Sequence, residues 1–79
     1  MGEFMQNKNT EKFRQLGLNI AYYRKMRGLS QSRLAELVNI SRTHFSRIET
    51  AECAVSLDVV FNICDALKVP PEKLFEFRD

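Results

Sequence analysis

The chain has 79 residues, of which 44% are hydrophobic and 28% charged, and its formal net charge is +2. This length predicts one domain, near the lower size limit for folding around a single hydrophobic core, where self-association is a common source of added stability. No apolar run approaches the roughly 18 residues that span a membrane, and no secretory segment follows the first residues, so we expect a cytoplasmic protein without a membrane partner.

The first ten residues are set apart from the rest by composition. Residues 1–4, MGEF, precede Met5 in the manner of an expression scar, and residues 5–10 are polar. We therefore expect residues 1–10 to be a scar followed by a flexible N-terminus, and residues 11–79 to form the folded domain.

The first predicted helix runs from about Glu11 to Arg27, and Gly28 is suited to end it because glycine tolerates a left-handed backbone. Leu18 and Tyr22 fall off its apolar stripe, so we expect both to be partly exposed. The stripe consists of Phe13, Leu16, Ile20 and Tyr23.

Residues 29–49, LSQSRLAELVNISRTHFSRIE, predict two short helices joined by a tight turn. Ser30 and Ser41 are good helix N-caps, and their spacing leaves room for little except helix, turn and helix. Asn39 falls where the chain must reverse, and asparagine tolerates a left-handed backbone better than most residues. Apolar residues follow the two caps at helical spacing: Leu34, Ala35, Leu37 and Val38, then Phe45 and Ile48.

The remaining chain predicts a loop over residues 50–55 and two more helices. Ser56 is a good N-cap with Asp58 in the first turn, and Pro70-Pro71 ends that helix and begins a short fifth one. The fold class expected is all-α, a compact five-helix domain without strands. The buried face of the fourth helix is predicted to hold Leu57, Val60, Ile63, Cys64 and Leu67.

Metal binding and catalysis have little support in the sequence. Cys53, Cys64 and the single His44 cannot supply the four ligands of a structural zinc site, so we expect no metal and no cofactor. No motif places a partner that would make His44 a base, so an enzyme is not expected. A disulfide between the two cysteines is disfavoured in a cytosolic protein.

The third predicted helix offers side chains that can contact DNA. Phe45 and Ile48 must face inward, which turns a polar set outward: Arg42, Thr43, His44, Ser46 and Arg47. Arginine can bind guanine in a forked geometry, hydroxyl groups can meet base edges or phosphates, and the helix N-terminus can hold a phosphate. The competing interpretation of the same residues is a solvated polar face.

The distribution of charge favours the DNA interpretation. From Lys12 to Arg47 there are eight basic residues and one acidic residue, which gives +7, whereas residues 48–79 carry −4 and residues 1–11 carry −1. A chain polarised in this way suits a protein that presents one face to a polyanion.

With these residues in place, the chain resembles the phage-repressor-like (Cro/XRE type) helix-turn-helix family over about residues 16–75. The resemblance rests on LxxxI-xxxR-xxxGLSQxxLA from Leu16 to Ala35, followed by SRTxFSRIE and a closing ALxV. It implies a lambda-repressor-like DNA-binding domain, with the helix-turn-helix at helices two and three. Restriction-modification controller proteins and small prophage regulators are similar in size and plan.

The family pattern also implies roles for particular residues. Gln31 would contact a phosphate and brace the recognition helix, and Arg24 and Glu49 would form a partly buried ion pair. The chain departs from the family at Asn39, Ala51 and Val55, where glycine, glycine and proline are usual. The candidate DNA-binding residues are Gln31, Ser41, Arg42, Thr43, His44, Ser46 and Arg47.

The function expected is therefore a sequence-specific DNA-binding transcriptional regulator. It would act as a homodimer on a palindromic operator of double-stranded DNA, through a recognition helix at about residues 42–50, and no small-molecule effector is evident. Rings near the C-terminus exceed what one small core should bury, which predicts a dimer interface at Leu74, Phe75 and Phe77. The alternative is an antitoxin-like or adaptor module of the same fold that mainly binds a protein.

Overall fold

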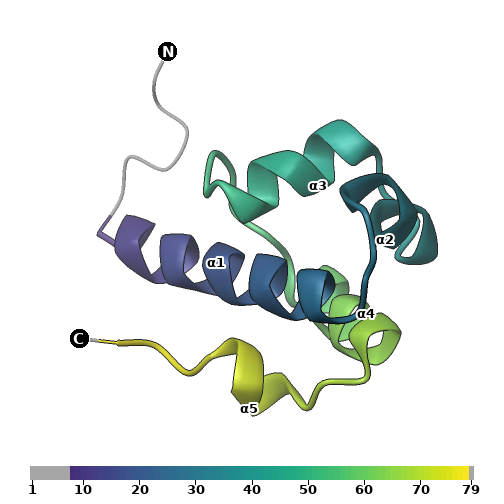
Figure 1. Ribbon diagram of the computed structural model, residues 1–79. Coiled ribbons are helices and arrows are strands. Elements are labelled where there is room, and N and C mark those ends of the chain that lie inside the picture. The colour runs from purple at the N-terminus through teal and green to yellow at the C-terminus, as the bar shows by residue number, and fades with distance from the viewer. Residues whose placement is uncertain (1–7, 79) are drawn as a thin grey trace.

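The computed structural model describes residues 8–78 (Figure 1). These residues form five helices and no strand, which confirms the predicted all-α fold. The predicted scar, residues 1–4, lies outside the described part, and the first helix begins one residue earlier than expected. The helices are α1 (Thr10–Met26), α2 (Gln31–Leu37), α3 (Arg42–Glu49), α4 (Leu57–Leu67) and α5 (Pro71–Leu74).

The long helix α1 crosses the middle of the domain and contacts three other helices (Figure 1). Helices α2 and α3 lie to one side of it, α5 lies to the other, and the chain after α5 runs back beside α1 toward its amino end. The core lies between these helices, and its largest fully buried side chains are Ile20, Leu34, Phe45, Val60, Ile63, Leu67 and Leu74.

Three serine caps fix where the middle helices begin. The hydroxyl groups of Ser30 and Ser41 each accept a hydrogen bond from a backbone N–H three residues later, at 3.0 Å, and Ser56 does the same at 3.2 Å. Each cap satisfies an N–H group that has no partner inside its helix. The three starts therefore follow from local sequence.

Four residues with a left-handed backbone produce the turns after the first four helices. Gly28 follows the end of α1 at φ 72°, and Asn39 makes the reversal between α2 and α3 at φ 62°. Both turns agree with the sequence prediction. Ala51 and Lys68 have φ 61° and 57° after α3 and α4. An L-residue with a Cβ atom is strained in this region, so these two positions store backbone energy that glycine would not.

Two apolar positions lie differently from the prediction. Leu57, expected on the buried face of α4, is 61% exposed because it is the first residue of the helix, and the first fully buried residue of α4 is Val60. Leu74, expected at a dimer interface, is 0% exposed because α5 turns it into the core against α1 and α4. Phe75 remains exposed, and Phe77 is half-buried against the core.

Side-chain amides of α1 hold the segment that follows α5. Asn19 donates to the carbonyl of Leu74 at 2.8 Å and to that of Glu76 at 3.2 Å. The amide of Gln15 both donates to the carbonyl of Arg78 and accepts from its backbone N–H, as a neighbouring strand would. Residues 74–78, called the tail below, are therefore held along α1 by hydrogen bonds from side-chain amides of α1 to the tail backbone.

Candidate nucleic-acid interface

Helix α3 presents a polar face because its two apolar residues anchor it in the core. Phe45 and Ile48 are 0% and 2% exposed, as their spacing predicts. Four other side chains of the helix, together with its cap, lie on the surface, and Ser46 is half-buried. The exposed candidates are Ser41, Arg42, Thr43, His44 and Arg47.

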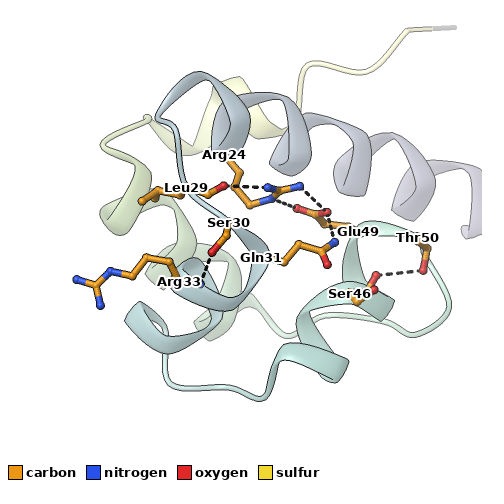
Figure 2. A network of polar contacts seen from close by, with 8 residues as sticks. All are labelled: Arg24, Leu29, Ser30, Gln31, Arg33, Ser46, Glu49 and Thr50. Carbon is orange, nitrogen blue, oxygen red and sulfur yellow. Dashed lines mark hydrogen bonds and ion pairs between the residues drawn. The ribbon is translucent and has the colours of Figure 1, made fainter.

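A buried polar network fixes the carboxyl end of α3 (Figure 2). The Glu49 carboxylate accepts from Arg24 Nε at 2.7 Å and Nη2 at 3.3 Å, and from Gln31 Nε2 at 2.8 Å. Arg24 also donates to the carbonyl of Leu29 at 2.9 Å. Three helices therefore meet at one carboxylate, and the side chains of Arg24 and Glu49 are only 10% and 6% exposed.

Gln31 lies at the first position of α2, where its side chain reaches across to Glu49 rather than outward (Figure 2). The bond links the helix-turn-helix pair at the end opposite to the turn. This bond is a contact through which Gln31 can brace the recognition helix, as the family pattern implies. The phosphate contact implied for the same residue stays a prediction.

The basic side chains differ in how they are used. Arg14 and Arg33 form short-range ion pairs with Glu11 and Glu36, and Arg27 donates to the carbonyls of Leu67 and Lys68 at the end of α4. Part of the positive charge counted in the sequence is therefore already in contact with other groups of the protein. By contrast, no carboxylate within residues 8–78 lies within ion-pair distance of the two arginines on α3. Their guanidinium groups are available to an anionic ligand.

The loop after α3 holds a shielded cysteine. Burial raises the pKa of the Cys53 thiol, and the positive charge of Arg47 opposes this shift. Cys53 and Cys64 are both free thiols. The part of the chain that the structure describes contains no group of three or more potential metal ligands and no helix long and apolar enough to cross a membrane.

The sequence patterns missed residues whose contacts are purely tertiary. Gly17 lies on α1 directly against the backbone of the last turn of α3, and Gln15 and Asn19 bind the tail. No local pattern marks these partners, because they lie 31 or more positions away along the chain. A glycine inside an otherwise regular helix was the one available signal, since it suggests a close approach of another backbone.

Comparison with known proteins agrees with the fold. The family described as "Helix-turn-helix domain" matches residues 15–77. No match to a curated protein sequence is found. Among solved structures, the restriction-modification controller protein C.AhdI from Aeromonas hydrophila superposes with a TM-score of 0.79 at 29% identity, covering 82% of this chain and 98% of that one.

Two further structures show the same arrangement. A hypothetical transcription factor, NHTF, from Neisseria has a TM-score of 0.78 at 25% identity, with 87% of this chain and 79% of that chain covered. A transcriptional regulator of the HTH_3 family from Vibrio cholerae has a TM-score of 0.78 at 24% identity, over 86% of this chain and 38% of that one. The last likeness supports the fold alone.

Proposed function

This chain belongs to the helix-turn-helix domain family, and on that premise we propose that it is a sequence-specific DNA-binding transcriptional regulator. It acts as a homodimer on a palindromic operator, with α3 of each subunit in the major groove. The observation that carries the proposal is the face of α3, where Arg42, Thr43 and Arg47 are exposed on a capped helix that the core and Glu49 hold in place.

The chemistry of this face suits base reading. Arg42 and Arg47 have no carboxylate partner among the described residues, so neither must break an ion pair before it binds DNA. Arginine binds guanine through two parallel hydrogen bonds, and threonine can contact a base edge or a thymine methyl group. The exposed N–H groups at the start of α3 suit a phosphate beside the bases.

A two-fold dimer supplies the second half of the interface. Two recognition helices about 34–36 Å apart meet successive major grooves on one side of the duplex, which is the geometry of a palindromic site. Because dimerisation and operator binding are coupled, such a regulator responds to its own concentration. C.AhdI, a restriction-modification controller protein by its name, supports this kind of role through its similarity over nearly its whole length.

The test begins with a binding site selected from a random DNA library by the wild-type protein. We expect Arg47→Ala to cost about 1–3 kcal/mol of binding to that site and to relax its preference at one base pair, with a far smaller effect on random DNA. Arg33→Ala is the charge-matched control, because Arg33 is also exposed but lies on α2 beside Glu36. Removal of this arginine should change the affinity for the selected site and the affinity for random DNA by the same factor.

Two outcomes would contradict the proposal in different ways. If Arg42→Ala and Arg47→Ala each weakened binding to the selected site and binding to random DNA equally, α3 would contact phosphates without reading bases. If the wild-type protein selected no site at any salt concentration, the adaptor or antitoxin-like alternative, in which this face binds a protein, would replace it.

A further inference from the structure

Gly17 allows α1 and α3 to approach each other with backbone against backbone. A Cβ atom at this position would lie 2.8 Å from the Glu49 carbonyl carbon and 2.8 Å from the Ile48 carbonyl oxygen, and closer still to the Glu49 carbonyl oxygen. Real Cβ atoms essentially never come this close to other atoms. All three neighbours are main-chain atoms, so no side chain could rotate to make room.

The same end of α3 is held at a second point by the same helix. Arg24 lies seven residues after Gly17, which is two helical turns, so both residues share one face of α1. Arg24 binds the Glu49 carboxylate at 2.7 Å, whereas Gly17 admits the Glu49 main chain. One contact draws the end of α3 toward α1, and the other sets how closely it can come.

We propose that Gly17 is a positioning residue for DNA recognition, which sets the tilt of α3 relative to the rest of the domain. The inference rests on the proposed function of α3. A methyl group at residue 17 pushes the carboxyl end of α3 away while Ser41 still caps its amino end. The helix therefore tilts, and the exposed side chain of Arg47, in its last turn, moves with it.

Base reading is more sensitive to such a tilt than phosphate binding. Bidentate contacts to a base edge need their donors held within about 0.5 Å of the productive position. Contacts to phosphates depend mainly on charge and tolerate displacement. A tilt of α3 therefore lowers the affinity for the selected site more than the affinity for random DNA.

The ratio of the affinity for the selected site to the affinity for random DNA distinguishes a positioning role from an effect on stability alone. Unfolding of a fraction of the protein reduces the active concentration for both DNA molecules equally, so the ratio of the two affinities does not change. Gly28→Ala is the matched control: it puts a methyl group on a left-handed residue at φ 72°, which strains the backbone, but nothing lies within 4 Å of that Cβ. It lowers stability without pushing α3.

The experiment measures binding of the wild type, Gly17→Ala and Gly28→Ala to the selected site and to random DNA. Gly17→Ala is also made in a Lys68→Gly background, because relief of the left-handed residue after α4 adds stability without altering a residue of α1 or α3. We expect the affinity ratio to fall about tenfold or more for Gly17→Ala in either background and to stay unchanged for Gly28→Ala.

Each contrary outcome overturns a specific statement. An unchanged ratio in folded Gly17→Ala, or a chain that stays unfolded in both backgrounds, makes Gly17 a requirement of folding alone and overturns the inference. A ratio that falls equally for Gly28→Ala does the same. A wild-type protein without any preference between the two DNA molecules overturns the proposed function itself, so that failure is distinguishable from the others.

Discussion

The Glu49 carboxylate receives hydrogen bonds from Arg24 and Gln31 at a site where its side chain is only 6% exposed. We expect Glu49→Ala to destabilise the domain by about 3 kcal/mol, because it leaves the Arg24 guanidinium buried without a partner. Replacing Arg24 and Glu49 together with apolar residues of similar volume should recover much of that loss. Denaturant melts of the single and double variants measure the coupling, and strictly additive effects would contradict it.

Lys68 is exposed and occupies the left-handed position after α4, at φ 57°. We expect Lys68→Gly to raise the free energy of unfolding by about 0.5–1 kcal/mol, because glycine adopts this conformation without strain. Lys68→Ala is the control: it removes the same long side chain but keeps the Cβ atom, so it should not stabilise. Thermal melts that rank alanine at or above glycine would show that the strain is absent.

At the scale of the element, Ser41 determines where α3 begins through its bond to the His44 N–H at 3.0 Å. We expect Ser41→Ala to destabilise the domain by about 1 kcal/mol. Ser41→Asp restores the cap but puts a negative charge at the end of the helix that faces DNA in the proposed complex. It should keep the stability of the wild type and weaken DNA binding, as melts and binding titrations can show. Undiminished binding by Ser41→Asp would place the DNA elsewhere.

The starts of α2, α3, α4 and α5 and the turns at Gly28 and Asn39 were predictable because their causes are local. Ser30, Ser41 and Ser56 cap the residues that directly follow them, and Pro71 begins α5 as its ring geometry allows. The predicted apolar stripe of α1 was also correct in leaving Leu18 outward.

What the sequence could not provide is the relation between elements. The burial of Leu74 depends on the orientation of the single-turn helix α5 relative to α1. Four residues are too few for a hydrophobic periodicity that would predict this orientation. The role of Gly17 depends on which backbone faces it, and the bonds of Gln15 depend on a tail 63 positions later. The polar face of α3 was predictable, whereas the contacts that hold it in place were only partly so.

At the scale of the whole molecule, the burial of Leu74 leaves Phe75 as the exposed member of the predicted dimer interface, at 42% exposure. We expect Phe75→Ser to weaken the homodimer about tenfold or more, because a ring buried in a small interface supplies much of its binding energy. Phe77 is unsuitable for this test, since it packs against the core. Sedimentation velocity over a concentration series measures the change.

Leu18→Ser on α1 is the matched control, because Leu18 is 61% exposed and apolar but lies on a different element. It should leave the dimer intact. Dissociation by Leu18→Ser alone would move the interface to α1, and a wild-type monomer that persists at high micromolar concentration with full operator affinity would remove the homodimer altogether.

The hydrogen bonds of Gln15 and Asn19 to the tail join parts of the chain that are 55 to 63 positions apart. Closing a loop of this length carries an entropic cost that nearby contacts do not have to meet. We therefore expect α2, α3 and their turn to form early from neighbouring residues, and the side of α1 that binds the tail to be covered last. We expect the exposed bonds to Glu76 and Arg78 to open first when the native state fluctuates, so that the earliest partially unfolded form keeps its helix-turn-helix and loses only the end of the tail.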